Sequence, residues 1–113
     1  MPKNAYVYIL ASRRQGTLYT GVTSKLGLRV EQHKLGTFGG FSKQYGCKTL
    51  VWFERHPAME QAIAREKQIK RWRRDWKLAL IEGENPEWRD LSDGWFEAPE
   101  GRLSWMQRPS SLS

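Results

Sequence analysis

The sequence predicts a small mixed α/β domain of the α+β type. Three runs are rich in β-branched and aromatic residues, as strands are, and they cover residues 5–12, 17–23 and 48–55. Two other runs carry the start and stop signals of helices. A chain of 113 residues buries only a modest core, so we expect one domain and no second independent one.

The first two strands are predicted to form a β-hairpin. The residues between them, 13–16, are Arg-Arg-Gln-Gly, which is a short polar connection that contains a glycine. Residues 36–46 have a different composition, with four glycines in eleven residues, and are predicted to be a loop that leads to the third strand.

The first helix is predicted to end at about Leu35, because Gly36 suits the left-handed position after a helix. Either Thr23 or Ser24 is placed to cap its N-terminus with a side-chain oxygen. The cap and the stop signal together predict a helix of about ten residues directly after the second strand.

A second helix is predicted to start at His56 and Pro57, since proline is favoured in the first turn. It extends into the low seventies. The sequence leaves open whether a break near Arg73 or Arg74 separates a further short helix. From Asn85 onward, Pro, Gly, Ser and acidic residues predict irregular structure.

Charge divides the chain into two parts. Residues 1–81 hold 16 Lys and Arg against 5 Asp and Glu, a net +11, whereas residues 82–113 hold 3 against 7, a net −4. We therefore expect a domain over residues 1–92 and an acidic, irregular tail over residues 93–113, anchored in part by tryptophans.

The basic part predicts a polyanionic partner, because contacts with phosphates release counterions and give affinity without sequence specificity. Composition alone leaves DNA, RNA and a membrane surface open. No apolar run is long enough to span a membrane, and the N-terminus lacks the pattern of a signal peptide, so we expect a cytoplasmic protein. The only cysteine, Cys47, forms no internal disulfide or zinc site, and we expect an inert or surface thiol.

Glu66 is the unusual residue of the second helix. On a helical wheel it lies near the middle of an apolar stripe, whose members are Met59, Ala62, Ile63, Ile69, Trp76 and Leu80. A carboxylate on the inner side of a helix must be paired, hydrated or bound to a cation. The pattern leaves two explanations: an ion pair with Lys70 or Arg29, or a metal ligand.

Arg29 and His33 share one face of the first helix, because they lie four residues apart. Arginine can bind a phosphate with two hydrogen bonds, and a histidine or a nearby tyrosine can carry a proton. Alone, such a pair is more often an ordinary solvated face.

The order of these residues carries a resemblance to a known family. The order is Tyr8, Tyr19, Gly21, Arg29, His33 and then Glu66 on a later helix. It resembles the GIY-YIG nuclease family, in which the triplets Gly-Ile-Tyr and Tyr-Ile-Gly lie on the first two strands. Here the triplets read Tyr-Val-Tyr and Tyr-Thr-Gly. The segments YVYILAS, GTLYTGVT, REKQIKRWRR and NPEWRDL resemble the small stand-alone bacterial branch, which is related to the N-terminal nuclease domain of the bacterial excinuclease.

The resemblance implies a three-stranded antiparallel sheet flanked by helices and the hydrolysis of DNA phosphodiester bonds with one divalent cation. By the same resemblance, Glu66 binds Mg²⁺ or Mn²⁺ and Arg29 holds the phosphate. Either Tyr8 or Tyr19 is the general base, and His33 assists within the site. Nearby Lys and Arg are expected to lower the tyrosine pKa for this task.

Further residues are assigned to nucleic-acid contact. They are Gly21, Lys25, Lys43, Lys70 and Arg73. Gly21 is interpreted as a point of close backbone approach. Val22 follows it where many relatives carry a lysine or polar residue, so Lys25 is the candidate for that role.

Two other functions compete with an endonuclease for DNA repair or processing. One is a non-catalytic nucleic-acid-binding module that keeps the fold, and the other is a basic protein-interaction domain with the acidic tail folded over it. Tyr8, Tyr19, Arg29 and Glu66 together favour the enzyme, because binding alone does not need a carboxylate on the inner stripe. No second recognition domain is evident, which favours structure-selective cleavage or a protein partner for targeting.

Overall fold

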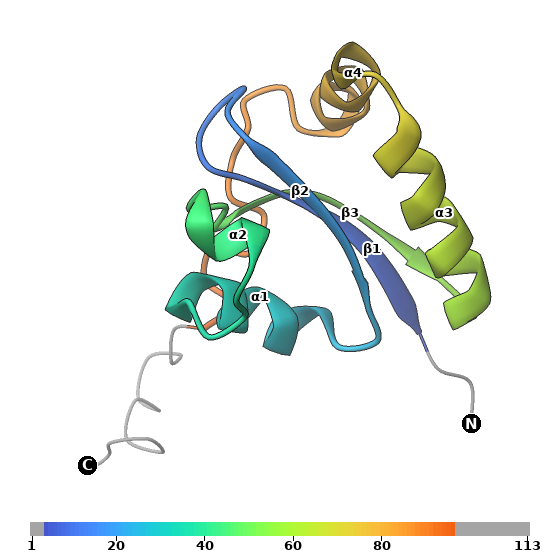
Figure 1. The fold of residues 1–113 in the computed structure, drawn as a ribbon, viewed down its shortest axis with the longest axis horizontal. Helices are drawn as coiled ribbons and strands as arrows, with labels where there is room; N and C mark the ends of the chain where they lie inside the picture. Colours follow the sequence, from blue (N-terminus) through green and yellow to red (C-terminus); the bar gives the residue numbers. More distant parts are fainter. Residues whose placement is uncertain (1–3, 97–113) are drawn as a thin grey trace.

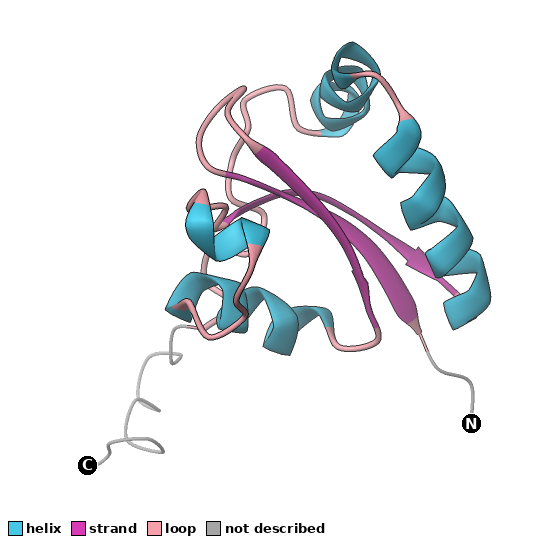
Figure 2. Ribbon diagram, in the orientation of Figure 1, coloured by secondary structure: helices cyan, strands magenta, loops and turns pink. Residues whose placement is uncertain are grey.

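The computed structural model describes residues 4–96. In chain order the elements are β1 (Ala5–Ala11), β2 (Leu18–Thr23), α1 (Leu26–Leu35), α2 (Phe41–Gln44), β3 (Thr49–His56), α3 (Met59–Arg71) and α4 (Arg74–Glu84). The strands form one antiparallel sheet with helices packed against it (Figures 1 and 2). The predicted α+β class, the three strands and the hairpin are confirmed.

The strand order is β2-β1-β3, so the first strand is the middle one. Successive side chains of a strand point to opposite faces. Since β1 is covered on both faces, its residues Val7 to Leu10 are all fully buried. The run of apolar and aromatic residues in this strand therefore follows from its central position.

Different helices cover the two faces of the sheet. In Figure 1, α3 and α4 lie on one side, and α1 and α2 lie on the other. The buried side chains form two clusters in the same way. We call the side with α3 and α4 the apolar face and the side with α1 and α2 the polar face.

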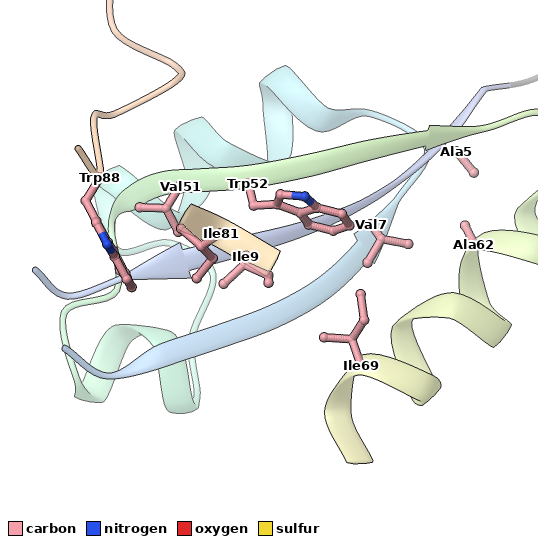
Figure 3. Close-up of a cluster of buried hydrophobic side chains, with 10 residues drawn as sticks. Ala5, Val7, Ile9, Val51, Trp52, Ala62, Ile69, Ile81 and Trp88 are labelled. Carbon is pink, nitrogen blue, oxygen red and sulfur yellow. The ribbon is translucent and has the colours of Figure 1, made fainter. Parts of the chain in front are cut away.

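The apolar face holds the larger cluster, which is drawn in Figure 3. Val7 and Ile9 of β1 pack there with Ile69 of α3 and Ile81 of α4, and all four are fully buried. Burying such a side chain stabilises the fold by about 1.5–3 kcal/mol relative to exposure. Trp52 is also buried there, and its indole N–H lacks a hydrogen-bond partner among residues 4–96.

The predicted side-chain cap of the first helix is wrong. Lys25 is the N-cap residue and provides no side-chain hydrogen bond. Thr23 still belongs to β2, and its hydroxyl accepts a hydrogen bond from the Lys25 N–H at 3.0 Å. At the other end the expectation is confirmed, because Gly36 follows the helix with φ 76°.

The segment 36–46 is not a simple loop. It contains α2, a single helical turn between Gly40, with φ 84°, and Gly46, with φ 66°. Both glycines adopt the left-handed region that other residues disfavour. The glycines that predicted a loop therefore bound a short helix, which carries Ser42 into the core.

The second predicted helix starts later than expected and is broken. β3 continues to His56, which pairs with Ala5, so α3 begins at Met59. Trp72 and Arg73 then have extended backbone, with ψ of 151° and 156°, before α4 begins. This break changes the helix direction (Figure 1).

Because of this break, the apolar stripe predicted from the helical wheel is partly wrong. A helical wheel assumes one continuous helix, so residues beyond Arg71 lose the phase of those before it. Trp76 of α4 is 51% exposed. Met59 and Ile63 are also more than a third exposed, whereas Ala62, Glu66 and Ile69 are buried.

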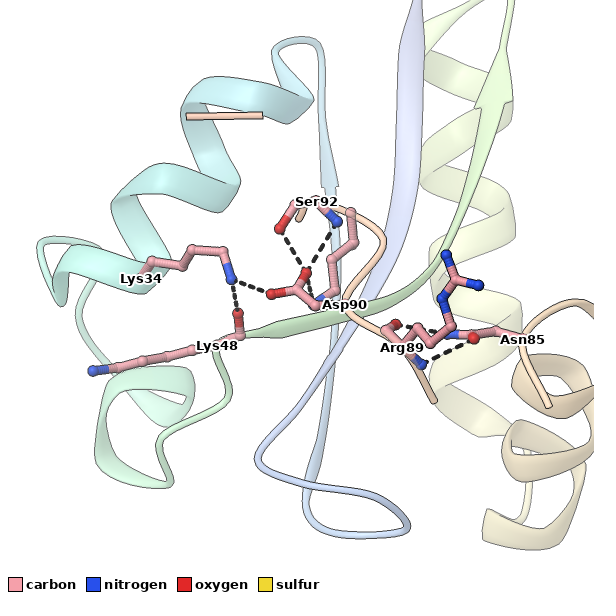
Figure 4. A network of polar contacts seen from close by, with 7 residues as sticks. Lys34, Lys48, Asn85, Arg89, Asp90 and Ser92 are labelled. Atoms are coloured by element: carbon pink, nitrogen blue, oxygen red, sulfur yellow. Dashed lines mark hydrogen bonds and ion pairs between the residues drawn. The ribbon is translucent and has the colours of Figure 1, made fainter. Parts of the chain in front are cut away.

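The segment after α4 is irregular, as predicted, but it is tied to the sheet (Figure 4). The Asn85 side-chain amide donates to the Val51 carbonyl at 3.1 Å. Asp90 accepts hydrogen bonds from Lys34, at 2.6 Å, and from Ser92. Although burial raises the pKa of the Asp90 carboxyl, these hydrogen bonds hold it below its ordinary value.

Two predicted anchors are found in or after this segment. Trp88 is buried in the apolar-face cluster. The Trp95 ring lies 6.0 Å from that of Phe53 but stays partly exposed. Residues 97–113, most of the predicted acidic tail, lie outside the described residues.

Two remaining expectations concern the membrane and the thiol. Within residues 4–96, each helix is too short or too polar to cross a membrane. Cys47 is fully buried in the polar-face cluster, so of the two predictions, an inert or a surface thiol, the surface thiol is the wrong one. Burial raises the pKa of its thiol, which favours the less reactive protonated form.

Candidate active site

The polar face contains a buried chain of three polar side chains from three elements. The Tyr8 hydroxyl, on β1, lies 2.9 Å from Nε2 of His33, on α1. The other ring nitrogen, Nδ1, lies 2.7 Å from the Ser42 hydroxyl, on α2. Since all three residues are buried, these hydrogen bonds fix the orientation of the imidazole ring.

Burial controls the protonation of this chain. It lowers the pKa of His33 to about 4, with a further contribution from the positive charge of Arg29. Burial also raises the pKa of Tyr8 above its ordinary value; Tyr19 adds to this increase and Arg29 opposes it. His33 is therefore a neutral base and Tyr8 a neutral hydroxyl at pH 7. The expectation that nearby cations lower the tyrosine pKa is wrong for Tyr8, because desolvation is the larger effect.

Tyr19 and Arg29 lie beside this chain. The Tyr19 ring centroid is 5.2 Å from that of His33 and 6.2 Å from that of Tyr8. The Arg29 guanidinium carbon lies 4.5 Å from the centroid of the Phe38 ring, in a cation–π contact. Tyr19 and Arg29 are partly exposed, unlike Tyr8 and His33, and so form the accessible side of the group.

Gly21 stands opposite Tyr8 in the hairpin register. A Cβ atom at this position would lie 2.5 Å from the Tyr8 hydroxyl oxygen and from the ring carbon that carries it. No side chain fits there unless Tyr8 moves. The predicted close approach at Gly21 is therefore present, and the group approached is the hydroxyl end of Tyr8.

Glu66 is buried on α3, which packs on the opposite face of the sheet from α1. Its Oε2 lies 2.7 Å from the ammonium group of Lys70, one helical turn later. Of the two pairings that the sequence left open, the structure shows the one with Lys70. No ion pair joins Glu66 to Arg29 in the described part of the chain.

The single carboxylate of Glu66 is compatible with a weakly bound hard cation. Residues 4–96 contain no group of three His, Cys, Asp or Glu side chains arranged to bind a metal ion. Mg²⁺ usually keeps several waters and takes one or two protein carboxylates plus phosphate oxygens, so a single carboxylate suffices. In this structure the Glu66 carboxylate is paired with the Lys70 ammonium group.

A pocket of about 240 Å³ lies at the edge strand β2; of the predicted catalytic residues only Tyr19 lines it, whereas Arg29 and Glu66 do not. Tyr19 reaches this pocket from the sheet, and Lys70, the partner of Glu66, reaches it from α3. The side chains of the polar face and of α3 therefore meet at one edge of the sheet.

The other predicted nucleic-acid contacts lie outside this pocket. Lys25, at the N-terminus of α1, and Lys43, in α2, are both exposed. Arg73 lies at the break between α3 and α4, where its guanidinium is 3.2 Å from Asp75 and 5.1 Å from the centre of the Trp76 ring. These cations are spread over the surface around the site.

Several residues of the site were not predicted from the sequence. They are Phe38, Ser42, which orients His33, and Phe41 and Lys77, which line the pocket. The available signal for α2 was the spacing of Phe41 and Tyr45, four residues apart, which places both on one face of a helical turn.

Comparisons with known proteins agree on one family. A family model described as the GIY-YIG catalytic domain matches residues 4–79. A UPF0213 protein from Syntrophus aciditrophicus is 40% identical over 88 residues, covering 77% of this chain and 98% of that protein. A UPF0213 protein from Streptococcus sanguinis is 33% identical over 81 residues, covering 72% and 92%.

A solved structure gives the same result for the fold. The solution NMR structure of the UPF0213 protein BH0048 from Bacillus halodurans matches with a TM-score of 0.50 and 28% sequence identity. The match covers 80% of this chain and 95% of that one. The likeness therefore extends over nearly the whole length of that protein.

Proposed function

We propose, because this chain belongs to the GIY-YIG family, that it is a metal-dependent endonuclease that hydrolyses DNA phosphodiester bonds. The domain is of the nuclease type, and nucleases of this type generally use divalent metals. The observation that carries the proposal is the buried Tyr8–His33–Ser42 chain beside the accessible Tyr19 and Arg29. Burying such polar groups costs folding free energy. In return the chain places a neutral base, His33, next to Arg29, a cationic group that can bind phosphate.

Exposure separates the roles of the two tyrosines. Tyr8 is fully buried, whereas Tyr19 lines the pocket. Tyr19 therefore takes the proton from the attacking water and transfers its own toward Tyr8. Tyr8 in turn donates to Nε2 of His33, while Nδ1–H donates to Ser42. The water oxygen bonds to phosphorus, and the bond from phosphorus to the leaving sugar oxygen breaks, with that oxygen protonated from solvent.

Arg29 holds the phosphate in this mechanism. Its guanidinium is planar and can donate two parallel hydrogen bonds to phosphate oxygens. The contact with the Phe38 ring keeps the side chain extended beside His33. Lys25, Lys43 and Arg73 lie farther out and contact the DNA backbone through charge, which adds affinity that falls with salt.

Glu66 is the proposed ligand of Mg²⁺ or Mn²⁺. Its carboxylate would hold the metal in place of the Lys70 ammonium group, which would then be available to a phosphate. A divalent cation bound there would supply positive charge for the scissile phosphate and the leaving oxygen. The buried position of Glu66 limits competition from water and keeps its orientation fixed.

The test replaces Glu66 with glutamine, which keeps the shape of the side chain and removes its charge. Glu66→Gln should slow the nicking of supercoiled plasmid in Mg²⁺ or Mn²⁺ by at least about a hundredfold, since single groups that stabilise transition-state charge have effects of that size. Glu60→Gln, on the exposed side of the same helix, should cleave like the wild type. EDTA should abolish the activity of both active proteins.

The Glu66–Lys70 ion pair also favours a second candidate, a non-catalytic nucleic-acid-binding module, because it neutralises the buried carboxylate of the site. The same experiment separates the two candidates. If the wild type and Glu66→Gln both bind plasmid, branched DNA and flapped DNA but neither cleaves any of them, the binding module is correct.

We further propose a structure-selective role in DNA repair or processing in the cytoplasm, with a protein partner for targeting. The resemblance to the N-terminal nuclease domain of the bacterial excinuclease supports this role. In this proposal residues 1–92 act as the nuclease domain, and residues 93–113 form the acidic tail that limits non-specific binding to the basic domain.

A further inference from the structure

The pocket at the edge of β2 has two chemically different walls. Its lining residues are Leu18, Tyr19, Thr20, Phe41, Lys70 and Lys77. None of them is acidic, although Glu66 lies just behind Lys70. The first three come from β2, whereas Phe41 comes from α2, Lys70 from α3 and Lys77 from α4.

The wall from α2 is aromatic and exposed. Phe41 is 48% exposed, although it belongs to a helix whose neighbouring residue, Ser42, is buried by its hydrogen bond to His33. Phe41 and Lys43, on either side of Ser42, are both exposed. The Phe41 ring lies nearly parallel to that of Tyr19, at 27° and 6.5 Å, and 4.6 Å from that of Tyr45. The structure therefore presents a cluster of aromatic rings, with Phe41 exposed, next to the proposed general base.

The opposite wall is cationic and crowded. Burial lowers the pKa of the Lys77 ammonium group, and the charges of Arg74 and Lys70 lower it further. Arg74 is held in place by hydrogen bonds to the carbonyl groups of Gln15 and Gly16, at 2.6 Å and 2.7 Å. Lys77 has no acidic partner within residues 4–96. Lys70 is paired with Glu66, whereas Lys77 stands near other cations without a counterion in that range, so an anion beside Lys77 would be stabilised.

We propose that this pocket binds one unpaired nucleotide next to the scissile phosphate. The base stacks on Phe41, and the phosphate lies between Lys77 and Lys70. The inference rests on the proposed endonuclease and specifies its substrate class as DNA with a single-stranded segment.

Unpaired bases fit this pocket because both faces of a paired base are covered inside a duplex. To reach Phe41, a paired base must first leave the stack, which costs a few kcal/mol. A base in a single strand or a flap lacks most of this cost. Stacking on an aromatic side chain then favours the single strand regardless of its sequence.

The experiment measures binding of fluorescent single-stranded and blunt duplex oligonucleotides of equal length, with EDTA present so that no cleavage occurs. Phe41→Ala should weaken single-strand binding roughly tenfold, since stacking of one base is worth that much, and leave duplex binding within about twofold. Leu35→Ala is the matched control, because Leu35 is a more exposed apolar residue outside the pocket. Equal single-strand binding by Phe41→Ala and Leu35→Ala overturns the proposal.

A second pair of variants tests the cationic wall. Lys77→Gln should weaken single-strand binding several-fold more than Lys67→Gln, which removes an exposed lysine of α3 outside the pocket, and Lys77→Arg should restore it. Equal effects of the two glutamine variants contradict the proposal. A 2-aminopurine base in the single strand adds a direct readout: its fluorescence should be quenched by the wild type and by Leu35→Ala, and less by Phe41→Ala.

These measurements are independent of catalysis. If the wild type cleaves no DNA but Phe41→Ala shows the selective loss, the endonuclease is wrong and the nucleotide pocket stands. If the wild type cleaves DNA but Phe41→Ala and Leu35→Ala bind alike, the pocket is wrong and the endonuclease stands.

Discussion

The two faces of the sheet are built from the same central strand and differ in what they bury. Val7 and Ile9 point to the apolar face, where their neighbours are aliphatic side chains and tryptophans. Tyr8, between them in sequence, points to the polar face, where its hydroxyl meets His33. Because successive side chains of a strand point to opposite faces, Tyr8 belongs to the candidate site while its neighbours Val7 and Ile9 stabilise the core. Glu66 is the exception, because it places a carboxylate on the helix that covers the apolar face.

The largest expected effect tests the apolar face. Ile81→Ala should lower the free energy of unfolding by about 2–5 kcal/mol, because it leaves a cavity among fully buried side chains. The cleavage rate per folded molecule should stay unchanged, since Ile81 belongs to the apolar-face cluster and Tyr8 to the polar-face cluster. Denaturant unfolding and plasmid nicking measure the two quantities.

Ile63→Ala is the matched control for this variant, because Ile63 is 37% exposed. It should lower the stability by much less than Ile81→Ala. Equal losses would show that the packing in Figure 3 does not determine the stability of this face.

The next effect tests the polar face through pH. Burial lowers the pKa of His33 to about 4 in the folded chain, against about 6.5 when unfolded. Between these two pH values the unfolded chain binds more protons than the folded one, so stability must fall as the pH falls from 6.5 to 4. A shift of this size corresponds to about 3.4 kcal/mol, at about 1.4 kcal/mol for each pKa unit. Unfolding in urea at several pH values measures it.

Two variants assign this pH dependence to one residue. His33→Gln should remove most of the slope between pH 6.5 and pH 4, whereas His56→Gln should keep it, since His56 lies partly exposed at the end of β3. Asp90 contributes only at lower pH, because the pKa of its carboxyl is held below its ordinary value. A slope that persists in His33→Gln contradicts the assignment.

Local patterns were sufficient for much of this architecture. The strands follow from short β-branched and aromatic runs, and the end of α1 follows from Gly36. The family resemblance, carried by the order of a few residues from Tyr8 to Glu66, is confirmed. These features depend on residues that are close in sequence or on a fixed spacing, so one sequence contains them.

Other features depend on contacts between distant segments. α2 is too short to be stable alone, and the hydrogen bond between Ser42 and His33 ties it to α1. The break at Trp72 and Arg73 contains neither glycine nor proline, so the sequence suggested a break near Arg73 or Arg74 but left open whether it exists. The raised pKa of Tyr8 results from burial, which only the packed structure defines. For the same reason the sequence did not predict the buried protonation states of Tyr8 and His33.

The smallest expected effect tests whether the geometry of the polar face requires a residue without a Cβ atom at Gly21. In Gly21→Ala the new Cβ atom would lie 2.5 Å from the Tyr8 hydroxyl, so the buried ring must move. Overpacking of this kind costs about 1–3 kcal/mol. A movement of Tyr8 also lengthens its hydrogen bond to His33, so cleavage should fall by more than the loss of folded protein explains.

Gly83→Ala provides the opposite expectation from the same substitution. Gly83 lies within α4 with nothing within 4 Å of the position of a Cβ atom, and alanine favours a helix over glycine by about 1 kcal/mol. This variant should therefore be slightly more stable and equally active. If both variants keep wild-type activity, then Tyr8 and His33 do not need their observed geometry, and the polar face would stabilise the fold in the same way as the apolar one.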